Sequence, residues 1–587
     1  MAASASNSPP TVSSPNPTAA TTTQTTLPLP DAFSHSCARW TQYPTNLVPR
    51  TTGMNPSALK AYFSKLDVAE SKLFTHDHNT VEVCFRDLEV EGVGALAKYN
   101  VHDELKLGKW LGITKIRDPA KHLINASKKD PKSRLIYIYA EHSRDPLRIQ
   151  RSMLTMILSF HQVMPEYLDF LWPFGLQSTP QDVRFSGFRQ QLCLKKPPRS
   201  LVIDALGRSG QQYQMSYNLK GVTLKDDGEW SIRNAAFCHQ YDVMTSRAVW
   251  IVTKGGMDLY ENYKELTGSD GRPEDKAFGS DEECFVSSLS PHLLFSRWST
   301  EDWRGFLRWL ESEVDNDAAL AVLGPREEGH HPKRYHPRDI RRMQIWEERA
   351  NEAIVVLEGN VDVLSALRQF YLNLSKDDRF PLGQSCLGEI KDFASELEAM
   401  ISDLKNNIGR AKALTKTTMD RKELMKQYRG DESAERMHRL NKNMEEEAIV
   451  VRIVTLVTLI YLPATFVSTF FSTDIVKYQV NDFPEGKFND MAMYRWLQVT
   501  LPLTFLTLFA AWAAKAWASN QSQEGSVLEV GDVVVVSDRV PIGERLLGLG
   551  QWVRSRRTPT QSTAKTLLPT TSGVPLGPVA GGKSAAG

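Results

Sequence analysis

The sequence predicts an α+β protein in which a cytosolic α/β domain is followed by long stalk helices and a C-terminal hairpin of two transmembrane helices. Three observations support this. Two uncharged stretches of 19 residues each lie close together, at 453–471 and 496–514. Helical apolar spacing precedes them from residue 338, and residues 31–337 mix strand and helix patterns.

Composition excludes several classes of protein. The 587 residues carry 70 Lys and Arg against 69 Asp and Glu, a net charge of +1. A nucleic-acid-binding protein usually has a clear basic excess, so none is expected as a partner. The six cysteines form no C-x-x-C pair, which argues against a zinc site or a disulfide framework. Residues 1–30 are mostly Ser, Thr, Pro and Ala and are interpreted as a disordered tail.

The region 31–337 is predicted to be an α/β domain. An apolar run at 135–139 predicts a buried strand, and alternation around a turn at 244–246 predicts a hairpin. The other predicted elements are a helix at 146–163, hairpin arms at 231–241 and 248–253, a polar loop at 267–283, and a helix at 301–314 capped by Ser299.

The region 338–452 is predicted to be a long helical stalk that is prone to coiled-coil formation. Helical spacing runs through 338–375, is broken by Pro381, Gly383 and Gly388, and resumes at 389–429. An ordinary helical bundle is the alternative. The second stretch has an apolar stripe at steps of three or four: Ile390, Phe393, Leu397, Ile401, Leu404 and Ile408.

The two apolar stretches predict membrane spans at 453–471 and 496–518. Nineteen helical residues cover about 28 Å, close to the hydrocarbon thickness of a bilayer. The short connection between them favours a hairpin at 453–518. Both termini are expected to be cytosolic, and the plasma membrane is the expected location. Residues 519–587 are interpreted as a mostly disordered tail. Tryptophans at the ends of the second span suit the membrane interface: Trp496, Trp512 and Trp517.

The first span carries a polar stripe on one helical face, with five hydroxyl residues among its six members. Hydroxyls are disfavoured in lipid, so this face is expected to point away from it. Several copies around an axis would line a pore with oxygens, whereas close helix packing is the other explanation. The predicted pore-lining residues are Thr455, Thr458, Leu462, Thr465, Thr469 and Ser472.

The outer end of the first span reads Ser472-Thr473-Asp474, and we predict that it forms the pore mouth and selectivity site. Asp474 is the candidate metal ligand, because an oligomer would place its carboxylates in a ring. Asp482 and Glu485 in the following loop would attract cations. A plain solvated loop is the alternative, since nearby basic residues offset most of the charge.

The stretch 454–467, VTLVTLIYLPATFV, resembles the sequence ahead of the signature in the CorA superfamily of Mg²⁺ and divalent-cation channels. The resemblance implies a homopentamer that carries Mg²⁺ or a similar cation, with no bound cofactor and with constrictions at Leu462 and Val451. The Gly-Met-Asn signature of the family should fall at 472–474, where this chain has Ser-Thr-Asp. By the same resemblance, the acidic runs 281–283 and 445–447 are candidate sensors of cytosolic cations, and solvated charge runs are the favoured alternative for both.

No enzyme motif is present: the chain lacks a phosphate-binding Gly-rich loop, G-x-S-x-G and H-E-x-x-H. Two hypotheses therefore remain, besides a third, a soluble α/β enzyme with a membrane tether, which would need a catalytic pocket that the sequence does not show. The first is a divalent-cation channel or transporter in the bilayer. The second is a membrane-anchored sensor or scaffold that kept this architecture after losing the signature.

Overall fold

The computed structural model divides into two compact units, Met1–Arg439 and Leu440–Gly587. Helix α10 (Leu387–Ser472) contributes residues to both. The described residues are 28–49, 51–88, 96–115, 124–142, 144–176, 184–197, 199–225, 228–323, 335–472 and 490–523.

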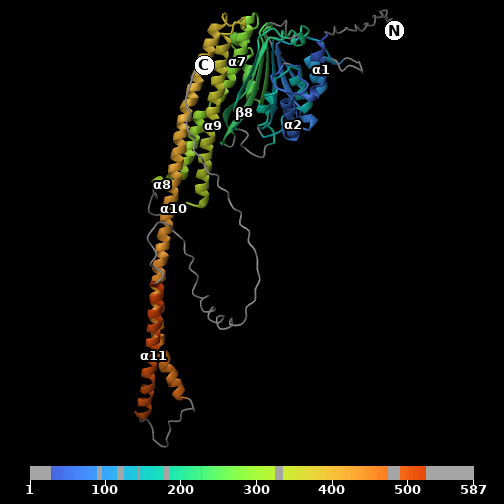
Figure 1. Ribbon diagram of the computed structural model, residues 1–587. Helices are drawn as coiled ribbons and strands as arrows, with labels where there is room; N and C mark the ends of the chain where they lie inside the picture. The colour runs from blue at the N-terminus through green and yellow to red at the C-terminus, as the bar shows by residue number, and fades with distance from the viewer. Residues whose placement is uncertain are drawn as a thin grey trace, which may run out of the picture. The chain divides into compact units, whose positions relative to one another are not determined.

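The first unit is built on a seven-stranded sheet of order β2-β1-β5-β9-β8-β7-β6 (Figure 1). Only β5 and β9 pair in parallel; the other neighbours are antiparallel. A separate pair joins β3 (Ile113–Lys115) to β4 (Ile124–Ala126). The strands of the large sheet are β1 (Val83–Leu88), β2 (Leu96–Val101), β5 (Ser133–Ala140), β6 (Phe188–Cys193), β7 (Gln212–Leu224), β8 (Trp230–Asp242) and β9 (Arg247–Gly255).

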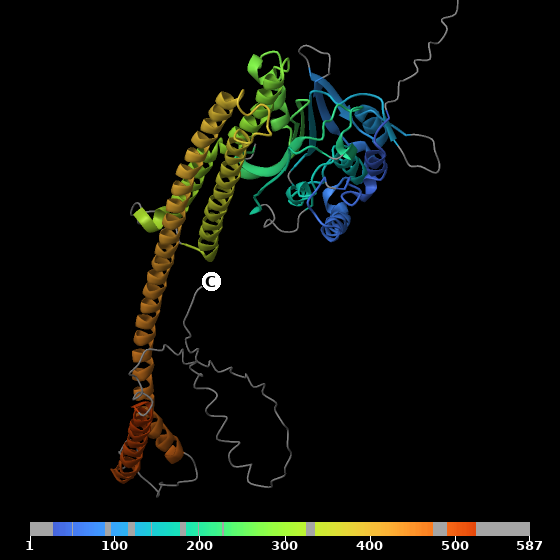
Figure 2. The same cartoon turned by 45° about the horizontal axis from the view of Figure 1, so that its top comes forward.

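Helices cover both faces of this sheet (Figures 1 and 2). Strand β5 is buried along its whole length, because Ile136 and Ile138 enter one core while Tyr137 and Tyr139 enter the other. This explains its unbroken apolar run. One core takes α1 (Asp31–Ala38), α2 (Pro56–Leu73), α3 (Glu104–Leu111), α4 (Arg151–Phe160) and α5 (Tyr167–Leu171). The other takes α6 (Asp258–Leu266), α7 (Asp281–Thr300), α8 (Trp303–Leu323), α9 (Pro337–Leu374) and part of α10.

The long helices follow the sequence pattern closely. Helix α9 matches the predicted 338–375 stretch, and the predicted stripe of the next stretch lies in the core, with Ile408 partly buried. The structure shows no break at Gly430, which lies within the continuous helix α10.

Three local predictions are corrected by the structure. Helix α4 is shorter than the expected 146–163. Ser299 lies inside α7 instead of capping the next helix, which begins at Trp303. The loop expected at 267–283 ends at Ser280, because Ser280 and Glu283 form a capping box that starts α7.

Strand β7 extends beyond its neighbour β6, whose pairing ends at Phe188 and Tyr217. Past that point Asn360 of α9 takes the place of a strand. Its Nδ2 donates to the carbonyl of Lys220 at 2.7 Å, and the amide of Lys220 donates to its Oδ1 at 3.0 Å. The side-chain amide thus satisfies two backbone groups that would otherwise be open.

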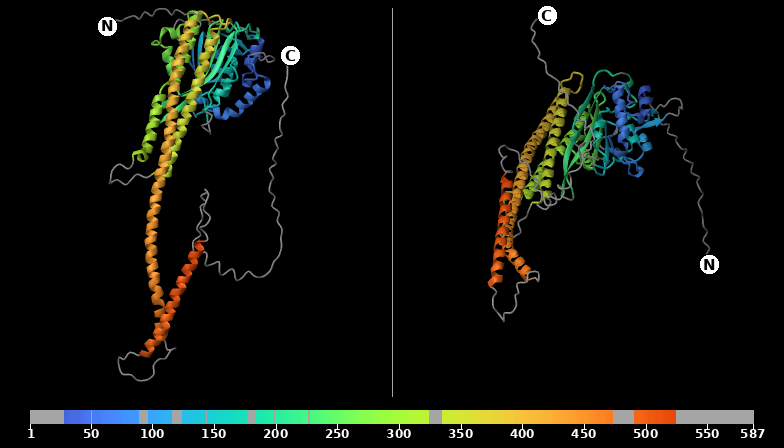
Figure 3. Two further views of the ribbon diagram at one scale, coloured as in Figure 1. Left: turned by 60° about the vertical axis from the view of Figure 1, so that its left-hand side comes forward. Right: turned by 60° about the horizontal axis from the view of Figure 1, so that its bottom comes forward.

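The second unit contains the end of α10 and helix α11 (Asp490–Gln523), which run antiparallel (Figure 3). Both helices are long and apolar enough to cross a membrane, α11 through Met493–Trp517. Twenty-five helical residues cover about 38 Å, enough to span a bilayer. Most described side chains of this unit are exposed.

Candidate functional site

The predicted stripe lies on the described part of α10, and its side chains are exposed in the single chain. Each hydroxyl donates its proton to the backbone of its own helix. The acceptors lie three or four residues earlier, at distances of 2.7–2.9 Å. The donors are Thr455, Thr458, Thr465, Thr469 and Ser472.

This hydrogen bonding decides what the stripe offers to a ligand. A hydroxyl whose proton is already donated presents its oxygen lone pairs outward as an acceptor. A hydrated cation presents the hydrogens of its bound waters, which need acceptors. The outward oxygens of the stripe can therefore accept hydrogen bonds of the kind that the waters of a hydrated cation donate.

The stripe does not pack against the second helix of its own chain. Pro463 and Val467 are the buried residues of α10 in the described part of the second unit. Each stands two residues from Thr465 and so lies roughly 200° around the helix axis from it. Close packing of α10 on α11 within one chain therefore does not account for the hydroxyl stripe.

The predicted mouth and loop residues lie outside the described part of the chain: Thr473, Asp474, Asp482 and Glu485. Leu462 and Val451, the expected constrictions, are 62% and 64% exposed. Both lie on the face of the stripe, since Leu462 is one of its members and Val451 precedes Thr455 by one turn.

The acidic runs do not gather metal ligands in the single chain. Residues 281–283 occupy the first turn of α7, where negative charge stabilises a helix N-terminus, and Glu283 completes the capping box. Residues 445–447 are exposed on α10. Within the described ranges, no group of three or more His, Cys, Asp or Glu could hold a metal ion.

Two buried histidines lie close together in the core beside the sheet. His239 of β8 and His292 of α7 are fully buried with 3.1 Å between Nδ1 and Nε2, and Tyr371 lies 2.9 Å from His292 Nε2. Burial lowers the pKa of His239 to about 3. These neutral rings are packed among aromatic side chains, so they contribute to the core and expose no reactive atom.

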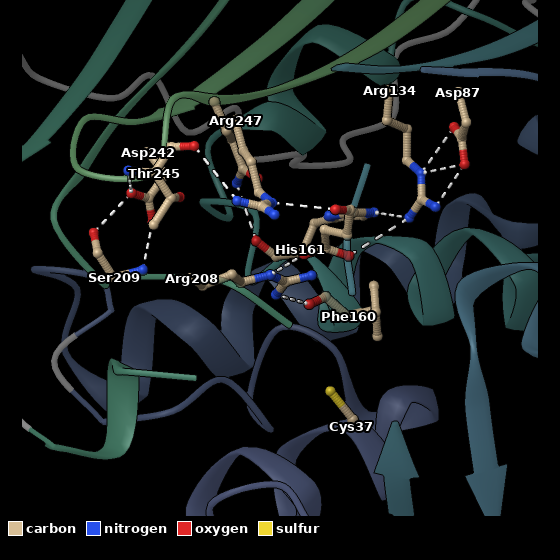
Figure 4. A network of polar contacts seen from close by, with 12 residues as sticks. Cys37, Asp87, Arg134, Phe160, His161, Arg208, Ser209, Asp242, Thr245 and Arg247 are labelled. Carbon is tan, nitrogen blue, oxygen red and sulfur yellow. Dashed lines mark hydrogen bonds and ion pairs between the residues drawn. The ribbon is translucent and has the colours of Figure 1, made fainter. Parts of the chain in front are cut away.

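A second buried network joins β1, β5 and the end of α4 (Figure 4). Arg134 donates to both oxygens of Asp87, with Nη2 at 2.7 Å, and Arg208 donates to Asp130 at 2.6 Å. Burial, with Arg208 and Arg134 nearby, holds the pKa of His161 well below its usual range. The network pairs charged side chains of the first unit with one another and so links β1, β5 and the end of α4.

Comparison with known proteins identifies a family. The family model described as CorA-like transporters matches residues 35–322. No curated protein matches the chain. Among solved structures, the CorA magnesium transporter from Methanocaldococcus jannaschii is 11% identical, with a TM-score of 0.31, and the match covers 73% of this chain and 97% of that one. The full-length CmaX protein is also 11% identical with a TM-score of 0.31, covering 74% and 97%.

The family match lies in the region that holds the sheet and its flanking helices α1–α8, and it is independent of the residues quoted from the first span. The two apolar helices lie outside the matched residues. Residues 35–322 therefore belong to the family of CorA-like transporters.

Proposed function

We propose that this chain is a divalent-cation transporter in which several copies place the hydroxyl stripe of α10 around a common axis. The observation that carries the proposal is the orientation of the stripe. Its hydroxyls have donated their protons to the helix, and they face away from the contact with α11. Rings of acceptor oxygens suit Mg²⁺, which loses its water reluctantly.

In this proposal the assembly is a homopentamer in the plasma membrane with both termini cytosolic, and the stalk runs through residues 338–452. Leu462 and Val451 form apolar constrictions along the axis, since both lie on the stripe face. Asp474, with Ser472 and Thr473, forms the mouth, and Asp482 and Glu485 attract cations to it.

The test is ion flux through the purified full-length chain in liposomes, read with a Mg²⁺-sensitive dye. Thr465→Leu replaces an oxygen ring with an apolar one and is expected to lower flux by at least about tenfold, the effect of 1.4 kcal/mol of added barrier. Ile460→Leu is the matched control. It lies on a different face of the same helix, and the substitution removes no polar group. Asp474→Ala is also expected to lower flux, and more strongly at low Mg²⁺ concentration than at high Mg²⁺ concentration.

Unchanged flux in both Thr465→Leu and Asp474→Ala would disprove the pore assignment.

The second candidate function, a membrane-anchored sensor or scaffold, is favoured by one observation: Ser472-Thr473-Asp474 replaces the signature of the family. Absence of flux with Mg²⁺, Ni²⁺ and Co²⁺, while the protein reaches the membrane as an oligomer, would support it.

A further inference from the structure

The two helices of the second unit contact each other around Pro463 of α10. In the described parts of 440–472 and 490–517, the buried residues are Pro463 and Val467 of α10 and Thr500 of α11, which is 6% exposed. Trp496 Nε1 donates to Ser468 Oγ at 3.1 Å, which shows which residues of the two antiparallel helices lie level with each other. Thr500, one turn beyond Trp496, therefore lies level with the turn that contains Pro463.

Pro463 leaves a backbone acceptor without its usual donor. Proline has no amide hydrogen, so the carbonyl of Leu459, four residues earlier, loses its intrahelical hydrogen bond. In the bilayer no water can replace that bond. A membrane helix tolerates proline where a neighbouring helix or a Ser or Thr side chain supplies the donor.

Thr500 has a donor without an acceptor. The neighbouring hydroxyls of α11 donate to their own helix, Thr504 to the carbonyl of Thr500 at 2.8 Å and Thr507 to that of Thr504 at 2.9 Å. The Oγ1 of Thr500 is buried and has no hydrogen-bond partner among the described residues. Both incomplete groups therefore lie at the same helix contact.

We propose that the hydroxyl of Thr500 is a latch that donates to the carbonyl of Leu459 and holds α11 against α10 at Pro463. When it closes, it fixes the bend of α10 at proline and, with it, the direction of the outer part of the stripe. The effect on transport rests on the proposed function, whereas the helix contact does not.

The test is a double-mutant cycle read by disulfide formation. Ser468→Cys and Trp496→Cys introduce a cross-linkable pair beside the contact in the full-length protein in liposomes. Thr500→Val is expected to slow cross-linking about threefold, the effect of a typical hydrogen bond between membrane helices. Thr500→Ser keeps the donor and should leave the rate unchanged. Thr507→Val is the matched control, since its hydroxyl already has an intrahelical acceptor.

Pro463→Ala restores the amide that bonds the carbonyl of Leu459. In that background Thr500→Val is expected to have no effect on cross-linking. Pro463→Gly restores the same amide, and it is used instead of Pro463→Ala if the alanine variant does not reach the membrane. An equal effect of Thr500→Val with and without Pro463 would overturn the latch, because the hydroxyl would then be serving its own helix. An equal effect of Thr507→Val would overturn it as well.

Flux measured on the same variants separates this inference from the proposed function. If the cycle is non-additive but the wild-type chain carries no ion, the latch stands and the transport proposal fails. If flux is present and the cycle is additive, transport stands and the latch fails. With both correct, Thr500→Val changes flux and Thr507→Val does not.

Discussion

The two units of the chain differ in where their apolar side chains go. In Met1–Arg439 the sheet is buried on both faces, and residues such as Trp250 and Trp303 are almost completely enclosed. In the described part of Leu440–Gly587, residues of similar size such as Phe466 and Trp512 are about two-thirds exposed, at 66% and 65%. The first unit buries its apolar side chains within itself, whereas the second requires lipid or further copies of the chain to cover them.

The largest expected effect is at a buried charge of the first unit. Asp87→Ala leaves Arg134 buried without its bidentate partner. Removing one member of a buried ion pair costs about 3–5 kcal/mol of unfolding free energy. Thermal unfolding of the purified chain, followed by tryptophan fluorescence, measures the loss. The control is Glu261→Ala, which removes an exposed pair with Lys264 and should cost less than about 1 kcal/mol.

The second prediction compares a leucine from each unit. Leu364→Ala removes a fully buried side chain of α9 and is expected to cost about 2–5 kcal/mol. Leu456→Ala on α10 changes a side chain that is 54% exposed and should stay within about 0.5 kcal/mol. Unfolding in detergent checks both. A loss of more than about 2 kcal/mol at Leu456 would show that a helix of another copy covers it, which would sharpen the comparison.

The smallest expected effect is a pH dependence in the first unit. Lys220 is buried, and its Nζ donates to the carbonyl of Phe185 at 2.7 Å. Burial lowers its pKa to about 7, below the value of about 10.4 in an unfolded chain. Between these values the unfolded state binds the extra proton, so this residue makes stability rise with pH.

Lys220→Met removes that titration while keeping the length of the side chain. The difference in melting temperature between wild type and Lys220→Met is expected to move in favour of the wild type as the pH rises from 7 to 9. The melting temperature at each pH measures it. A difference that stays constant over this range would show that Lys220 does not titrate there.

Local patterns predicted the elements well and their partners poorly. The hairpin at 231–241 and 248–253 is present as β8 and β9, since alternation and a turn are encoded by neighbouring residues. The parallel pairing of β5 with β9 was not predicted, because it joins Ile136 to Ile251 and no local signal records such a contact. Strand β7 was missed although its sequence does carry a local signal, the alternation that sends Tyr213, Met215 and Tyr217 into one core.

For the candidate site, the helical period predicted which residues share the stripe face. It did not show that the hydroxyls are bonded to their own backbone, nor that Pro463 and Val467 mark the contact with α11. Those facts depend on the second helix. The importance of Thr500 had one available signal in the sequence, the proline in α10 that leaves a carbonyl without a donor. The roles of Asp474, Asp482 and Glu485 stay predictions, since these residues lie outside the described part.

Asn360 has a consequence for how the chain avoids self-association during synthesis. Where β7 extends past β6, its side-chain amide occupies the backbone groups of Lys220. An open strand edge is a template on which another chain can add a strand and aggregate. One asparagine on a helix therefore blocks strand addition at this point, and a newly made chain is protected there only once α9 has docked on the sheet.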